Sequence, residues 1–195
     1  SAVILANPKI KKLSEVRHKN MAEMEAISTG LSRLDQTLGG FYFGQLIILT
    51  GERGLGKSTL GSQFITESVA QNVPSFCYSG ELPEWFFQDW FDRQCAGPEY
   101  VNCVVSERGF NNYLVDGAAM EQIHDWYDEK CYIYDNSVID SEDGENQTIL
   151  QTIDNAIRQY GCRMIMIDNL MTAISDDLKS DLYRQQSVFV RELAK

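Results

Sequence analysis

A glycine-rich stretch of the chain reads Gly51-Glu52-Arg53-Gly54-Leu55-Gly56-Lys57-Ser58-Thr59. Its fixed positions match the pattern G-x-x-x-x-G-K-[ST], in which backbone N–H groups converge on phosphate oxygens. The glycines allow close approach of the backbone, the N-terminus of the following helix contributes its dipole, and Lys57 contributes a positive charge. Ser58 stands where a hydroxyl would bind Mg²⁺. We therefore interpret residues 51–59 as a phosphate-binding loop, the P-loop.

The residues on either side of the P-loop predict its structural context. An apolar run of strand length, residues 45–50, precedes the loop. Apolar residues at helical spacing follow it until Asn72 and Pro74 end the pattern. The expected local structure is therefore a strand, the loop and a helix.

Strand-like runs alternate with helical patterns along the rest of the chain. We expect strands at residues 75–79, 131–134 and 163–168, and a minor strand at 100–105. Helical patterns begin near Pro83 and recur at 119–127, 149–160 and 182–193. The interior of 163–168 is apolar without interruption, which is typical of a parallel strand buried on both faces. The alternation predicts the α/β class, with a mostly parallel central sheet flanked by helices.

The N-terminal residues have a different composition. Residues 1–26 contain no glycine and carry a group of basic side chains, Lys9, Lys11, Lys12, Arg17 and Lys19. We interpret 1–26 as an arm or linker helix and 27–195 as the folded domain.

Composition limits the class of protein. The chain has 195 residues, 44% hydrophobic and 23% charged, which fits one compact domain and excludes disorder. No apolar run approaches the length of a membrane span. Five cysteines without a C-x-x-C pair suggest buried thiols in a reducing compartment, above all Cys77, Cys131 and Cys162. We expect a soluble, cytoplasmic protein that does not bind membranes.

The net charge is −11. The surplus of acidic residues is concentrated between Asp125 and Asp154, a stretch with nine acidic residues and one basic residue. This pattern favours a solvated acidic face. A negative net charge does not attract nucleic acid electrostatically. Any contact with nucleic acid therefore needs a local basic loop, or a ring of subunits that presents one.

Two acids follow strands whose ends should lie beside the P-loop, since ligands of parallel sheets bind at the carboxyl ends of the strands. Asp168 ends the run at 163–168, where an acid would hold the hydration shell of Mg²⁺. Glu81 follows the run at 75–79 and would polarise the water that attacks a γ-phosphate. The alternatives are a strand cap for Asp168 and a helix cap before Pro83 for Glu81.

Several segments in order resemble the RecA-like ATPase domain of replicative helicases, most closely those of the DnaB and Twinkle type, including phage-borne forms. The resemblance covers about residues 26–195. The matching segments besides the P-loop are Ile27-Ser28-Thr29-Gly30-Leu31, Leu34-Asp35, Leu38-Gly39-Gly40, Gly44-Gln45-Leu46, Tyr78-Ser79-Gly80-Glu81 and Ile167-Asp168-Asn169-Leu170.

The resemblance implies a RecA-like P-loop NTPase that hydrolyses ATP with Mg²⁺. It makes Glu81 the catalytic base and matches Lys57, Ser58 and Asp168 to the phosphate and magnesium residues. It also implies a hexameric ring, single-stranded DNA in the central channel, and ATP bound between neighbouring subunits.

The chain departs from the family pattern after Asp168. The family continues with strands that carry a phosphate sensor, DNA-binding loops and an arginine finger, and no matching segments follow here. The strand that normally lies between the Asp168 strand and the P-loop strand is also missing. We therefore expect a domain that is incomplete at its C-terminal side, with a gap that other residues or another chain fill, and little activity from these residues alone.

Other functions remain open. A recombinase or clock-type ATPase shares the Ser28-Thr29-Gly30 and Gly39-Gly40 segments, while a small-molecule P-loop kinase or a nucleotide-binding regulatory module shares the P-loop.

Three further features have two interpretations each. Arg93 is either a nucleotide or interface contact or, as we favour, a solvent-facing helix residue. The basic arm either contacts DNA or, as we favour, docks on the next subunit. Five aromatic residues form a cluster that we interpret as core or subunit packing and not as a base-stacking platform: Trp85, Phe86, Phe87, Trp90 and Phe91.

Overall fold

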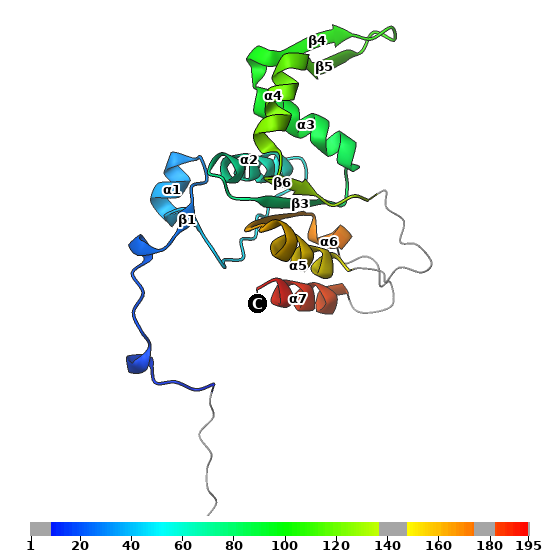
Figure 1. Ribbon diagram of the computed structural model, residues 1–195. Coiled ribbons are helices and arrows are strands. Elements are labelled where there is room, and N and C mark those ends of the chain that lie inside the picture. The colour runs from blue at the N-terminus through cyan, green and yellow to red at the C-terminus, as the bar shows by residue number, and fades with distance from the viewer. Residues whose placement is uncertain (1–8, 137–147, 174–181, 195) are drawn as a thin grey trace, which may run out of the picture.

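The structure of the chain, a computed structural model, describes residues 9–136, 148–173 and 182–194 (Figure 1). Its centre is a parallel sheet of three strands in the order β6-β3-β7, namely Cys131–Ile133, Ser75–Ser79 and Met164–Asp168. Helices cover both faces of this sheet (Figure 1). The α/β class with a parallel sheet flanked by helices is therefore confirmed.

The middle strand β3 divides the core into two halves. All of its residues are buried, because it is paired on both edges and covered on both faces. Cys77 faces α2 (Lys57–Ala70) and α3 (Glu84–Ala96) through Ile65 and Phe87. Phe76 and Tyr78 face the opposite side and α5 (Ile149–Tyr160). Alternation of side chains along one strand thus supplies both halves of the core.

The helices begin and end close to the expected positions. In α5, the side chain of Thr148 accepts from the backbone N–H of Gln151 in a capping box, and Gly161 ends the helix at a φ of +67°. The other expected helices are α4 (Gly117–Tyr127) and α7 (Leu182–Leu193). A short helix that the sequence did not predict, α6 (Leu170–Ala173), follows β7 directly.

The aromatic cluster on α3 is mainly core. Phe87 and Phe91 are buried, and their rings stack with centroids 6.0 Å apart. Trp85 and Phe86 lie at the exposed start of the helix instead. The packing interpretation is therefore confirmed for the buried pair only.

The minor strand expected at residues 100–105 forms outside the main sheet. It is β4 (Val101–Val105), which pairs antiparallel with β5 (Asn111–Val115), a strand that the sequence did not predict. This hairpin stands beyond α3 and α4, and most of its side chains are exposed (Figure 1).

Of the two forms expected for the N-terminal residues, an arm or a linker helix, the described residues 9–25 do not form the α-helix. Residues 9–25 run extended apart from the 3-10 turns Leu13–Glu15 and Met21–Glu23, and nearly all are exposed (Figure 1). Short single turns form here because the sparse apolar side chains have no surface on which a longer helix could bury them.

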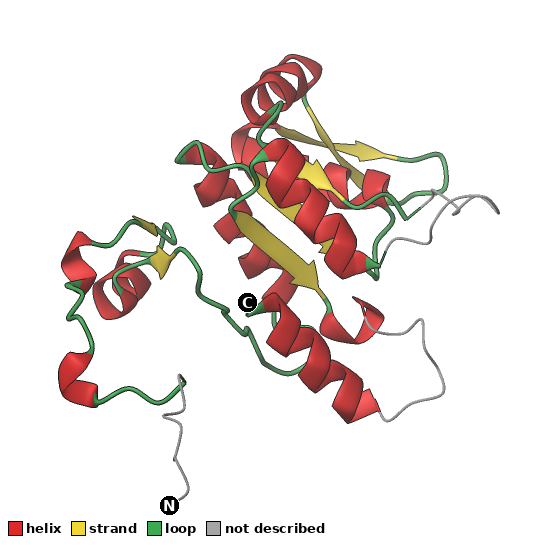
Figure 2. Cartoon of the chain, turned by 60° about the horizontal axis from the view of Figure 1, so that its bottom comes forward, coloured by secondary structure: helices red, strands yellow, loops and turns green. Residues whose placement is uncertain are grey.

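A small unit follows the arm and stands to one side of the main sheet (Figure 2). It consists of β1 (Ala26–Ile27) and β2 (Phe41–Tyr42), which pair antiparallel, and α1 (Ser32–Leu38). The carboxylate of Asp35 accepts from the Ser28 hydroxyl and from the backbone N–H of Thr29, and these bonds hold the pKa of Asp35 below its usual range. This network gives the Ser28-Thr29-Gly30 segment a structural role.

Side chains tie this unit to the rest of the fold. The amide of Gln71, at the end of α2, accepts from the N–H of Ser28 and donates to its carbonyl, at 2.9 and 3.0 Å. The ring of Phe41 meets Phe64 of α2 edge to face at 4.9 Å. The unit is thereby anchored on the P-loop helix.

The strand expected at residues 45–50 does not form. This segment is extended but unpaired, and the side chain of Ile48 is 71% exposed. In the part of the chain that the structure describes, no strand pairs with the second edge of β7. The physical reason is that an isolated strand leaves its N–H and C=O groups without partners, so a strand forms only beside a neighbour.

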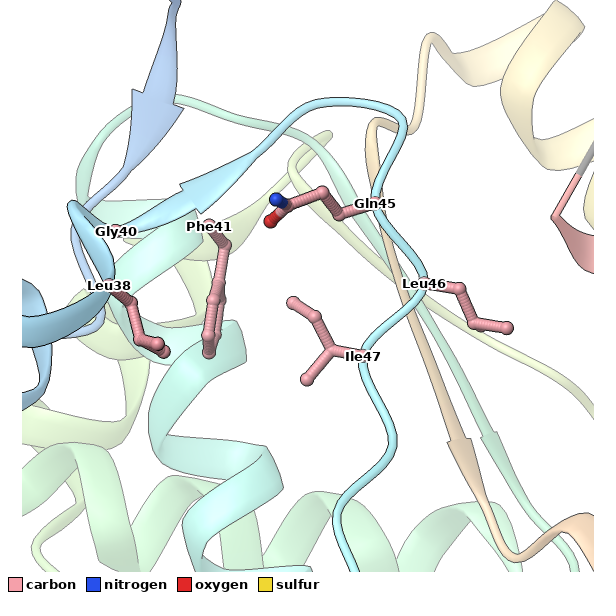
Figure 3. Close-up of a pocket in the computed structure, with 6 residues that line it drawn as sticks. All are labelled: Leu38, Gly40, Phe41, Gln45, Leu46 and Ile47. Carbon is pink, nitrogen blue, oxygen red and sulfur yellow. The ribbon is translucent and has the colours of Figure 1, made fainter. Parts of the chain in front are cut away.

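Part of this segment borders an open pocket of about 340 Å³ (Figure 3). Ile47 points toward Phe41, whereas Leu46 points away (Figure 3). None of its lining residues is titratable: Leu38, Gly40, Phe41, Gln45, Leu46 and Ile47. The pocket therefore offers no acid or base for catalysis.

The remaining expectations concern cysteines, acids and the membrane. Cys77 and Cys162 are buried and Cys131 is half-buried, and burial raises the pKa of Cys162 to about 11. The acids at 140, 142, 143 and 145 lie outside the described residues. Within the ranges described, no helix has the length and apolar character to cross a bilayer.

We predict that two isoleucines differ sharply in their contribution to stability. Ile65→Ala, at a fully buried position, should lower the free energy of unfolding by about 2 to 5 kcal/mol. Ile48→Ala should lower it by less than about 0.5 kcal/mol, because its side chain is mainly in water. Urea denaturation of the 195-residue chain measures both, and equal losses would contradict the exposed placement of residues 45–50.

Candidate functional site

The candidate site begins where the central strands end. In the parallel register of β3 and β7, Ser79 pairs with Asp168, and the N–H of Gly80 donates to the Asp168 carbonyl at 2.8 Å. The ends of both strands are therefore level. Glu81 follows Gly80 directly, so the two acids that the sequence singled out lie at the same edge of the sheet, as expected.

The carboxylate of Glu81 has a partner that the sequence analysis did not name. The side-chain amide of Asn169 donates to Glu81 Oε1 at 2.6 Å. Glu81 does not cap α3, whose N-cap residue is Pro83 and has no side-chain cap bond. Asn169 was quoted as part of a matching segment, but nothing in the pattern gave its side chain a role.

A close backbone approach holds this edge together. A Cβ atom at Gly80 would collide with the side chain of Thr172 in α6, so only glycine fits at this point. Thr172 in turn bonds to Asn169 through its backbone N–H and its hydroxyl. The turn after β7 thus packs directly against the residue that precedes Glu81.

The P-loop has the backbone geometry that its glycines predict. Gly54 and Gly56 both have a φ of +80°, a region that favours glycine, and α2 begins at Lys57. No atom lies within 4 Å of the position of a Cβ at either glycine. The loop therefore leaves open space around its backbone, which suits close approach of a phosphate.

The other P-loop residues have distinct positions. The Lys57 ammonium donates to the carbonyls of Gly51 and Glu52, at 2.9 and 2.7 Å, and so lies across the loop. Ser58 is half-buried at the start of α2. The remaining members have exposed side chains: Glu52, Arg53, Leu55 and Thr59.

Tight packing joins the P-loop helix to the strand that carries Asp168. A Cβ at Gly61 of α2 would lie 2.9 Å from the sulfur of Met166 in β7. Glycine therefore lets α2 approach β7 closely, two residues before that strand reaches Asp168. Together the P-loop and the two strand ends offer backbone N–H donors, one lysine, one hydroxyl and two carboxylates, residue types that a magnesium–nucleotide complex would need.

Arg93 is not directed at this edge. Its guanidinium pairs with Asp89 one turn earlier on α3, and its side chain is 27% exposed. It is thus a helix residue with a local partner, and the nucleotide or interface contact considered for it stays a prediction.

A second polar cluster lies between α3 and α4. Asp92 is buried, and its carboxylate bonds to His124 Nε2 at 2.8 Å and accepts from the Tyr127 hydroxyl at 3.2 Å. Burial raises the pKa of Tyr127. The cluster joins the two helices and has a structural role.

In the described parts of the chain, no group of three or more His, Cys, Asp or Glu residues is arranged to hold a metal ion.

Comparison with known proteins gives related sequences of two kinds. The chain is 25% identical over 129 residues to the replicative DNA helicase DnaB of Treponema pallidum, covering 66% of this chain and 29% of that protein. It is 31% identical over 74 residues to DnaB of Leifsonia xyli, covering 37% and 16%. It is 33% identical over 84 residues to the DNA repair protein RadA of Rickettsia bellii, covering 40% and 19%.

The matched region is at most 29% of the length of these curated relatives. A family model has a wider match to the chain itself, because the DnaB-like helicase C-terminal domain aligns with residues 26–195. This range includes the P-loop and both carboxyl ends described above. The chain therefore belongs to the DnaB-like helicase C-terminal domain family.

Proposed function

We propose that this chain is the ATP-hydrolysing motor domain of a replicative DNA helicase. The observation that carries the proposal is the paired register of Ser79 and Asp168, because it brings Glu81 and Asp168 to one edge of the sheet. The packing of α2 on β7 extends the same arrangement to the P-loop.

In this function each residue has a defined task. The P-loop N–H groups and Lys57 bind the β- and γ-phosphates of ATP. Ser58 and Asp168 would hold Mg²⁺, directly or through water, and the ion supplies positive charge to the phosphate oxygens. Glu81 accepts a proton from the water that attacks the γ-phosphorus, and the bond to the β-phosphate oxygen breaks to release ADP and phosphate.

The proposed partners are further copies of the chain and single-stranded DNA. With a net charge of −11, one copy alone does not attract DNA through its overall field, whereas a hexameric ring can present local basic loops to a central strand. Residues 9–24 of the arm are mostly exposed, which is consistent with docking of the arm on a neighbouring subunit. The free cysteines among the described residues agree with a cytoplasmic protein.

The RadA relative favours a second candidate, a recombination ATPase of the same fold class. The two functions differ in their products. Strand separation of a forked DNA by the full-length protein supports the helicase, whereas filaments on single-stranded DNA without strand separation support the recombination ATPase.

We predict that Lys57→Ala abolishes tight binding of Mg-ATP and leaves the fold intact. The Lys57 ammonium would contribute positive charge to the phosphates, and its bonds in this structure go to carbonyls of the exposed loop itself. Titration with a fluorescent ATP analogue measures the affinity, and Lys11→Ala on the exposed arm is the control. Equal affinities of the Lys57 variant and the unaltered protein would rule out the P-loop assignment.

We predict that Glu81→Gln in the full-length protein retains ATP binding and loses turnover by about 100-fold or more, since general-base assistance contributes about 10² to 10⁴. Asp168→Asn should also weaken magnesium-dependent binding. Glu84→Gln, an acid in the first turn of α3, is the control and should keep its turnover. Steady-state ATPase assays decide the matter: an unchanged rate for Glu81→Gln would place the base elsewhere.

We predict that purified residues 1–195 bind nucleotide weakly and hydrolyse ATP far more slowly than the full-length protein. The segment before the P-loop is unpaired in the described structure, so the loop lacks support from the sheet. No segment of these residues matches the arginine finger of the family. In related phosphoryl-transfer systems an arginine finger raises the rate by a factor of about 10³ to 10⁵. DNA-stimulated ATPase is the measurement, and a rate equal to that of the full-length protein would contradict the prediction.

A further inference from the structure

We propose that Asn169 is a positioning residue that orients the Glu81 carboxylate for attack by water. The inference rests on the proposed function, since it assigns Glu81 the role of base. The observation behind it is the 2.6 Å bond from Asn169 Nδ2 to Glu81 Oε1, which spans the ends of two neighbouring strands.

The Asn169 side chain is held in place from its own side of the site. Its Oδ1 accepts from the backbone N–H of Thr172 at 3.1 Å, and its carbonyl accepts from the Thr172 hydroxyl at 2.9 Å and from the N–H of Ala173 at 3.2 Å. These bonds close the turn into α6. The bonds to Thr172 and Ala173 therefore hold Asn169 in place independently of its bond to Glu81.

The chemistry of the two partners determines which way the amide faces. The N–H of Thr172 can only donate, so the atom beside it must be the amide oxygen. Glu81 Oε1 serves as the acceptor, so the atom beside it must be the amide nitrogen. The reverse orientation would place donor against donor and acceptor against acceptor. Both neighbours therefore select the same arrangement.

Glu81 needs such a partner because its side chain is exposed. A free glutamate samples several rotamers, and ordering it costs free energy. Asn169 engages one carboxylate oxygen, which leaves the second oxygen to accept the proton of the attacking water. A charge-assisted hydrogen bond is strong enough to select one rotamer.

Asn169 also couples the two acids of the site. It follows Asp168 directly, so the proposed metal-binding residue and the anchor of the base share one turn. Gly80, which precedes Glu81, lies against Thr172 of the same turn. Asp168 and Glu81 are therefore linked through Asn169 by one peptide bond and one hydrogen bond.

The test uses the full-length protein and two variants that keep the turn. Serine and aspartate at position 169 can still accept from the Thr172 N–H, as residues at helix N-termini do. Aspartate has no hydrogen to donate, and the shorter serine lacks the amide group that reaches Glu81. Asn169→Ser and Asn169→Asp should therefore lower kcat for ATP by about 10- to 100-fold, the usual range for residues that orient a functional ligand. The KM for ATP should stay close to that of the unaltered protein.

The matched control is Asn112→Ser, the same substitution on the exposed hairpin strand β5. It should leave kcat unchanged. Circular dichroism and nucleotide affinity of the Asn169 variants should match those of the unaltered protein, which separates positioning from unfolding.

A double-variant cycle distinguishes action through Glu81 from a purely structural role of Asn169. If Asn169 acts through Glu81, then adding Asn169→Ser to Glu81→Gln should cause no further loss of kcat. A full additional loss in the double variant would show that Asn169 acts independently and would overturn the inference.

Three other outcomes also overturn it and can be told apart. Normal kcat in Asn169→Ser, while Glu81→Gln is inactive, removes the positioning role and leaves the proposed function standing. Normal kcat in Glu81→Gln removes the base itself and the inference with it. A rise in DNA-independent turnover in Asn169→Ser would mean that the bond restrains Glu81, and this result rejects positioning for attack.

Discussion

The parallel pairing of β3 with β7 is the interaction on which the rest of the structure depends. Five residues of each strand are paired from Ser75 with Met164 to Ser79 with Asp168. β3 is buried along its whole length, so both halves of the core form against it. Because parallel strands end at the same edge, the same pairing carries Glu81 and Asp168 to one place.

The level strand ends also create the contact between Glu81 and Asn169. Glycine at position 80 removes the side chain that would otherwise hold α6 away, and the turn after β7 then reaches across to the neighbouring strand. A register shift of one residue would separate the carboxylate from its amide partner and would turn every side chain of the strand to the other face. The geometry of the site is therefore a consequence of the register.

The unpaired segment at 45–50 also shows that strand pairing decides the local structure. Its residues have the apolar character of a strand, yet the structure leaves them exposed. Strand formation requires a neighbour that satisfies the backbone N–H and C=O groups, and within the described residues no strand pairs with this segment. Sequence pattern indicates which residues suit a strand, whereas pairing decides whether the strand forms.

The sequence alone specified the P-loop, the α/β class, most helices and the edge where two acids meet, because these depend on local periodicity, on glycines and on the rule for parallel strands. It did not reveal β5, whose pattern is weak, or the role of Asn169. Those features, together with the unpaired state of residues 45–50, depend on contacts between segments far apart in the chain. Only the tertiary structure decided them, because local patterns carry no information on which distant group completes a hydrogen bond.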